Sequence, residues 1–110
     1  MTAWIAEQRV VFLHRDGTRS PGRIALGAPV VRGQDCACEV ALDGFARPVR
    51  IYGDSTLQAL LLGARFLARR LRDFTSKGGR VVFPAAGSGD SDEQRDVPLD
   101  ALFGGLPRAP

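Results

Sequence analysis

The sequence has few of the side chains on which catalysis and metal binding usually depend. Among its 110 residues there are one histidine, two cysteines and no asparagine. A structural zinc site takes four cysteine or histidine ligands, and a serine hydrolase needs a histidine base and oxyanion donors. The scarcity of these side chains argues against both kinds of site. We therefore predict no catalytic, metal-binding or cofactor-binding residues and do not expect an enzyme.

Long hydrophobic runs are also missing. The longest nearly apolar stretches are Val10–Leu13 and Leu57–Ala64, whereas a membrane-spanning helix needs about 20 such residues. The first residues do not combine a basic segment with a long apolar run, as a secretory signal does. We therefore expect no membrane partner, no secretory signal and a cytoplasmic location.

The two cysteines, Cys36 and Cys38, lie too close in sequence for an unstrained disulfide. Residues two apart on a strand point to the same face of the sheet. Free cysteine is also among the residue types most often buried. We interpret both as core residues, and a metal or redox role with His14 as a further ligand is the alternative.

Turn signals divide the first half of the chain into β-strands. The Asp-Gly pairs at 16–17 and 43–44 are typical of hairpin turns, where glycine adopts a positive φ. Around these turns lie runs that are rich in β-branched residues or alternate polar with apolar residues, and we expect them to form strands over 3–15, 23–26, 36–43 and 47–53. A glycine at 27 and a proline at 29 interrupt the second strand, which we expect to resume at Val30. Four strands joined by short turns predict an antiparallel meander.

A single helix follows the strands. Asp54 or Ser55 can cap its N-terminus and Gly78-Gly79 can end it, which gives about 22 residues and a length of roughly 33 Å. A short strand at 80–83 comes next. The fold class that we predict is α+β, an antiparallel four- to five-stranded β-meander with one long α-helix packed across one face, in the order β-β-β-β-α-β.

Charge is distributed unevenly along the chain. Residues 1–84 carry 13 basic and 7 acidic side chains, whereas residues 85–110 carry 2 basic and 5 acidic ones. We predict a single α+β domain over 1–84 and a flexible acidic tail over 85–110, because the tail begins with small and polar residues. A short apolar segment at 97–103 either docks on the domain or binds a partner.

The predicted helix has two apolar faces. Positions advance by about 100° per residue, and one stripe should pack on the sheet; its members are Leu57, Leu60, Leu61, Ala64, Leu67, Ala68, Leu71 and Thr75. On the opposite side, apolar side chains stand beside arginines, as they do in many protein interfaces. This candidate interface consists of Ala59, Leu62, Phe66, Arg65 and Arg69. The tail segment Leu99–Phe103, a second copy of the chain or another protein could cover it; otherwise it is exposed.

A second candidate surface is basic. Arg47, Arg50 and Tyr52, with Arg9 beside them, could form a stripe on the outer sheet face that binds nucleic acid. Fourteen of the fifteen basic residues are arginine, however, which coding bias explains as well as phosphate binding does. The stripe also has only one aromatic ring for stacking on bases.

One segment after the meander is distinctive. Residues Ile51–Leu62 read Ile-Tyr-Gly-Asp-Ser-Thr-Leu-Gln-Ala-Leu-Leu-Leu. A strand, a Gly-Asp-Ser step and a Leu-Gln-Ala-Leu helix in this order resemble a family of small uncharacterised bacterial proteins, a domain of unknown function. The resemblance covers about residues 3–84 and implies a bacterial cytoplasmic domain without an assigned active site.

A binding function fits this sequence better than a catalytic function does. We predict a non-catalytic protein-interaction or oligomerisation module, whose partner is an unknown protein or a second copy of the chain. A nucleic-acid-binding domain that uses a basic sheet or helix face is the alternative.

Overall fold

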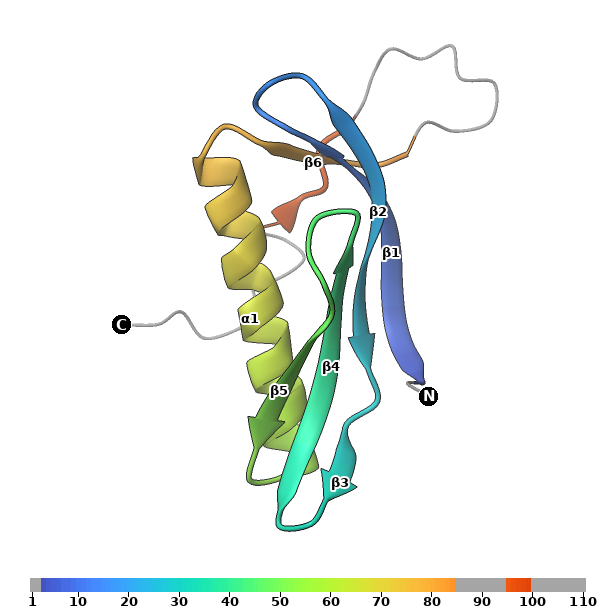
Figure 1. Ribbon diagram of the computed structural model, residues 1–110, viewed down its shortest axis with the longest axis vertical. Helices are drawn as coiled ribbons and strands as arrows, with labels where there is room; N and C mark the ends of the chain where they lie inside the picture. Colours follow the sequence, from blue (N-terminus) through green and yellow to red (C-terminus); the bar gives the residue numbers. More distant parts are fainter. Residues whose placement is uncertain (1–2, 85–94, 100–110) are drawn as a thin grey trace.

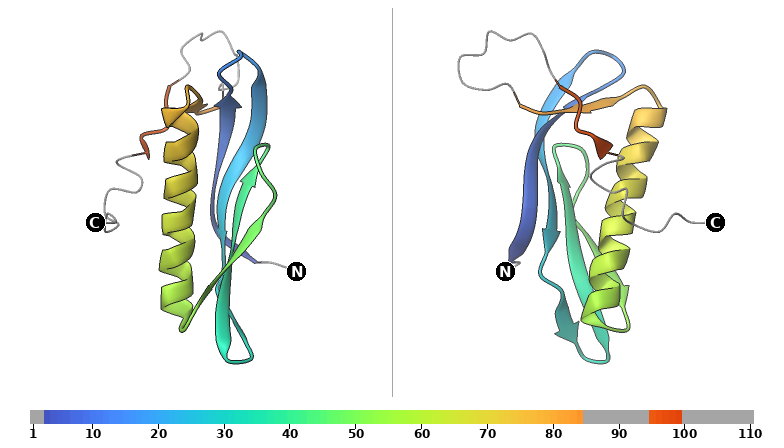
Figure 2. Two further views of the ribbon diagram at one scale, coloured as in Figure 1. Left: turned by 60° about the vertical axis from the view of Figure 1, so that its left-hand side comes forward. Right: turned by 180° about the vertical axis from the view of Figure 1, so that it is seen from behind.

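The computed structural model describes residues 3–84 and 95–99, and within them it contains six strands and one helix (Figure 1). The elements are β1 Trp4–Leu13, β2 Arg19–Gly27, β3 Val30–Arg32, β4 Asp35–Asp43, β5 Val49–Gly53, α1 Thr56–Ser76 and β6 Arg80–Val82. The strands form one antiparallel sheet, and α1 lies across one face of it (Figure 2). The predicted fold class is confirmed.

The order of the strands shows how the chain crosses the sheet. Both β2 and β3 pair with the same edge of β4, so they act as one strand that is interrupted around Pro29, as predicted. β5 pairs with the other edge of β4. β6 returns to the far side of the sheet, where it pairs with β1. The chain therefore crosses from one sheet edge to the other through α1.

The two Asp-Gly turns adopt the backbone conformation that the sequence predicts. Gly17 and Gly44 have φ angles of 93° and 91°, which favour glycine over any residue with a Cβ. In the first turn, Asp16 accepts hydrogen bonds from the Thr18 hydroxyl at 2.7 Å and from the Thr18 N–H at 2.9 Å. These bonds, the hydroxyl first, lower the pKa of Asp16.

The main core lies between the sheet and the C-terminal half of α1. Its buried members are Val10, Phe12, Ile24, Val40, Leu42, Leu67, Ala68, Leu71, Val81 and Val97. Phe12 is at the centre, because its ring lies 5.3 Å from that of Phe45 and 5.6 Å from that of Phe74. Aromatic rings at these separations add attraction beyond the burial of their area.

Helix α1 begins and ends where the sequence predicts. The Ser55 hydroxyl accepts a hydrogen bond from the Gln58 N–H at 3.0 Å and so caps the N-terminus. Gly78, with a φ of 99°, follows the last turn. The helix packs mainly on β4 and β5. Among the described residues, no helix is both long and apolar enough to cross a membrane.

Residues 95–99, which we assigned to the tail, pack as part of the domain. Val97 is 5% exposed and belongs to the main core. Its N–H donates to the Val81 carbonyl at 2.8 Å, and the Arg80 guanidinium contacts the Asp96 carboxylate at 2.9 Å. The predicted boundary at residue 84 therefore leaves out a packed segment. The rest of the predicted tail, including 100–103 of its apolar segment, lies outside the described residues.

Candidate functional site

The face of α1 that points away from the sheet carries most of the predicted interface. Arg69 is exposed, and Leu62, Arg65 and Phe66 are half-buried. Phe66 also packs against the main core, so only part of its ring is open to solvent. These four residues lie at the surface, and their role in an interface stays a prediction.

The placement of Ala59 on this face is wrong. Ala59 is 0% exposed and clusters with Cys36 and Cys38 beneath the start of α1. The cause is a close approach between β5 and the helix: a Cβ added at Gly53 would lie 2.7 Å from the Ala59 nitrogen. Backbones come this near only where side chains are small.

A row of residues four apart faces the sheet, and small residues form its first half. This inner row consists of Ala59, Gly63, Leu67 and Leu71, all buried. A Cβ at Gly63 would lie 3.1 Å from the Cys38 sulfur, so the helix approaches β4 closely there. The N-terminal half of α1 therefore packs through alanine and glycine rather than through the leucines beside them.

Because alanine and glycine occupy the contact with the sheet, two leucines of the N-terminal half are exposed to solvent. Leu57 is 64% exposed and Leu61 is 44% exposed, although the sequence placed both on the core stripe. This correction defines an outer row, again with residues four apart: Leu57, Leu61, Arg65 and Arg69. Sequence reasoning missed its two leucines. The signal that could have revealed them is the small pair Ala59 and Gly63, which marks where a helix approaches its neighbour.

The outer row changes from apolar to positive along the helix. Asp73 is the only acidic residue of α1, and Lys77 binds it at 3.1 Å. Arg70 lies over the ring of Phe45 at 5.4 Å, on the side of the core. The outer row therefore consists of two exposed leucines followed by two arginines.

The C-terminal half of α1 has a cover that the N-terminal half does not share. Val97 packs in one cluster with Ala68 and Leu71, and Leu99 packs against that cluster. No described residue covers Leu57 or Leu61 to the same degree, because both are exposed. The tail segment thus docks beside the helix, but its described part reaches only the C-terminal half.

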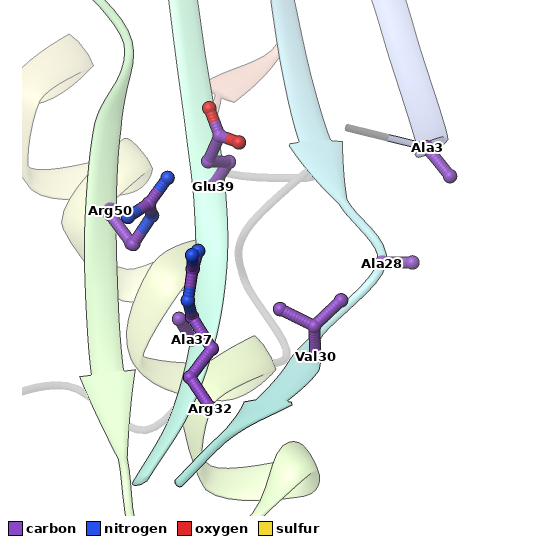
Figure 3. Close-up of a pocket in the computed structure, with 7 residues that line it drawn as sticks. All are labelled: Ala3, Ala28, Val30, Arg32, Ala37, Glu39 and Arg50. Atoms are coloured by element: carbon purple, nitrogen blue, oxygen red, sulfur yellow. The ribbon is translucent and has the colours of Figure 1, made fainter. Parts of the chain in front are cut away.

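A shallow depression of about 290 Å³ lies on the opposite face of the sheet. Its floor is Ala37, and Arg32, Glu39 and Arg50 stand on one side of it (Figure 3). Tyr52 pairs with Ala37 across β4 and β5 and is exposed on the same face, as predicted. A carboxylate among the arginines weakens the attraction of this surface for phosphate groups.

The acidic residues elsewhere on this face also interrupt the predicted basic stripe. Arg9 lies on β1, where it pairs with Arg23 of β2. Arg23 is itself held by two carboxylates, those of Asp43 at 2.8 Å and Glu7 at 3.4 Å. Arg9 therefore does not continue the positive surface around Arg50.

The two cysteines are core residues, as predicted. Both are free and buried, and they face α1 with Ala59. Burial raises the pKa of the Cys38 thiol, and its sulfur lies 3.3 Å from the Gly27 carbonyl oxygen. Within residues 3–84 and 95–99, no three His, Cys, Asp or Glu side chains are grouped so that they could hold a metal ion.

No protein-family model, curated protein or solved structure matches this chain. The resemblance to small bacterial proteins therefore stays an expectation from the segment Ile51–Leu62.

Proposed function

We propose that this protein is a non-catalytic protein-interaction module and that the outer row of α1 is its binding surface. The observation that carries the proposal is the exposure of Leu57 and Leu61, two leucines one helical turn apart. The half-buried Leu62 and Phe66 lie further around the helix, beyond Arg65 and Arg69, and form a separate apolar patch. Exposed apolar side chains bordered by arginine are typical of surfaces that bind proteins.

The distribution of charge indicates the kind of partner. Arg69 is exposed at one end of the outer row, and Leu57 is exposed at the other. A segment that matches this row presents apolar side chains followed by carboxylates, because unlike charges attract and like charges repel across an interface. We therefore propose a partner with an apolar and acidic binding segment.

A second copy of the chain fits this surface less well. Two copies of α1 packed antiparallel about a two-fold axis at Gly63, so that the whole outer row is covered, would oppose Leu57 to Arg69 of the second copy. They would also oppose Leu61 to Arg65. Leucine against arginine loses apolar contact and adds no charge pair, so an isologous contact over the whole row is unfavourable. An axis between Leu57 and Leu61 would pair the leucines but leave Arg69 outside the contact. The outer row favours a different protein.

Photo-crosslinking tests the proposal in the cells that make the protein. A benzoylphenylalanine in place of Leu61 should yield a discrete adduct with one other protein. The same group in place of Arg19, which is exposed on β2, is the matched control and should yield none. A Leu57→Glu substitution should remove the adduct, because a carboxylate there removes half of the exposed leucine surface.

Two outcomes would contradict this function. One is the absence of any adduct at Leu61 while the protein is folded and abundant. The other is an adduct that contains only two copies of this chain, which would mean self-association through α1.

The nucleic-acid alternative has one observation in its favour. Arg32 and Arg50 stand beside the depression on the outer sheet face, and Tyr52 is exposed on that face. A filter-binding assay with a short single-stranded oligonucleotide distinguishes nucleic-acid binding from the protein-interaction function. Retention at low salt that Arg50→Ala reduces would favour this alternative over the protein-interaction module.

A further inference from the structure

Among the described residues, nothing pairs with one edge of β1 along most of its length. β6 pairs only with Val11–Leu13, and no strand of the described residues lies beside Trp4–Val10 on that side (Figure 1). The other exposed strands are shorter: β5 has 5 residues and follows Pro48, and β3 has 3 and follows Pro29. Natural sheet edges are commonly blunted by shortness and proline, because unpaired backbone groups attract another strand. The free part of β1 contains no proline, but it carries the charged Glu7 and Arg9 and has a register shift between Trp4 and Ala6, so its pairing depends on how these charges are opposed.

A hydrogen bond on the side of β6 away from β1 shows to which edge each residue directs its backbone N–H and C=O groups. The N–H of Val97 donates to the carbonyl of Val81 at 2.8 Å, so Val81 directs its backbone groups away from β1. Its neighbour Val82 therefore directs them toward β1, where it lies opposite Val11. Backbone groups alternate in direction along a strand, which makes the odd-numbered residues of β1 face the edge occupied by β6.

The same alternation extends to the free part of the edge. β1 has no register shift between Ala6 and Leu13, so Glu7 and Arg9 face this edge as Val11 does. A side chain supports this assignment: the Gln8 amide donates to the Arg9 carbonyl at 2.8 Å, so that carbonyl is accessible at the edge. Because a carbonyl oxygen has two lone pairs, it can also accept from a second strand. Glu7 and Arg9 thus present their backbone N–H and C=O groups outward.

Charge then selects one pairing register. Within Ala6–Val10, only Glu7 and Arg9 direct their backbone groups to the shared edge. In a two-fold antiparallel pair, residues that face the edge lie opposite one another, so Glu7 of one copy lies opposite either Glu7 or Arg9 of the other. A pair centred on Glu7 opposes two carboxylates, and one centred on Arg9 opposes two guanidinium groups. A pair centred on Gln8 opposes Glu7 to Arg9 twice. Opposite charges directly across a ladder stabilise it and like charges destabilise it.

We propose that β1 pairs with β1 of a second copy, antiparallel and centred on Gln8, so that the two sheets become one. The ladder runs from Ala6 to Val10 of each copy. It ends at Val10 because Val11 is already paired with β6, and it ends at Ala6 because a register shift lies between Trp4 and Ala6. The surface differs from the outer row of α1, so the inference goes beyond the proposed function.

The existing contacts of Glu7 permit this pairing. Glu7 is exposed, and one of its oxygens lies 3.4 Å from Arg23, which has a shorter contact of 2.8 Å with Asp43. The second carboxylate oxygen of Glu7 can therefore meet Arg9 of the second copy. Arg9 is exposed as well.

Charge exchange on β1 provides the test, with solution mass by light scattering over a concentration series as the readout. The wild type should approach twice the chain mass at high concentration. Glu7→Arg alone and Arg9→Glu alone each oppose like charges twice, so each should weaken the dimer about tenfold to a hundredfold. The double variant Glu7→Arg/Arg9→Glu restores two attractive pairs and should recover the wild-type mass.

A mixture of the two single variants should form a mixed dimer, because each substituted side chain then meets the opposite charge. Arg19→Glu makes the same change of charge on an exposed site outside β1 and should leave the mass unchanged. Circular dichroism of each variant confirms the fold.

Two results would overturn the proposal: a wild type that stays monomeric up to its solubility limit, or a dimer that both single variants leave intact. Neither result affects the crosslink at Leu61, and loss of that crosslink leaves the dimer intact. The two proposals therefore fail separately.

Discussion

The two halves of α1 both contain leucines but bury them differently. In the C-terminal half, Leu67 and Leu71 are buried between the sheet and the segment that carries Val97. In the N-terminal half, Leu57 and Leu61 are exposed. Helical periodicity is the same in both halves, so the difference comes from what packs on each half.

Small side chains account for the N-terminal half. Ala59 and Gly63 occupy the sheet-facing positions there and let the helix lie close to β4 and β5. Larger rings fill the C-terminal half, where Phe74 lies 5.6 Å from Phe12. The C-terminal half therefore buries its leucines in the main core, and the N-terminal half leaves two leucines exposed.

Truncation of one leucine in each half should give the largest difference in the free energy of unfolding. Leu71→Ala removes a side chain that is 0% exposed, which should lower the free energy of unfolding by about 2–5 kcal/mol. Leu57→Ala is the matched control and should change it by about 0.5 kcal/mol or less. Denaturant unfolding followed by circular dichroism measures both. Equal losses in the two variants would remove the distinction between the halves.

A smaller loss of stability should follow from weakening the contact between the segment that carries Val97 and the C-terminal half of α1. Val97→Ala shortens a side chain that is 5% exposed in the main core, and we expect it to lower the free energy of unfolding by about 1–2 kcal/mol. Val31→Ala, on an exposed site of β3, is the control with the same change in volume. If Val97→Ala were as neutral as its control, the docked segment would contribute nothing to the C-terminal half.

The sequence predicts the elements of this fold because their signals are local. The Asp-Gly pairs define turns through the φ of one glycine each, and the alternation of Cys36, Cys38 and Val40 defines a buried strand face. The cap at Ser55 and the glycine at 78 define the ends of the helix. None of these features depends on distant residues.

The rotation of α1 about its axis could not be read from the sequence in the same way. Periodicity counts leucines as core residues, whereas the position of the helix over β4 and β5 favours Ala59 and Gly63 at the contact. The docking of Val97 depends on its pairing with β6, which is distant in sequence and which no local pattern predicts. For the candidate site, the surface positions of Leu62, Phe66, Arg65 and Arg69 were predictable, and the two most exposed leucines were not.

The smallest expected effect belongs to the exposed leucines of the outer row. We claim that Leu57 and Leu61 form a surface that the fold does not need. The free energy of unfolding of Leu57→Glu/Leu61→Glu should equal that of the wild type to within about 1 kcal/mol, because both side chains remain in water. An unfolded variant, or a loss as large as that of Leu71→Ala, would show that these leucines belong to the core and contradict the claim.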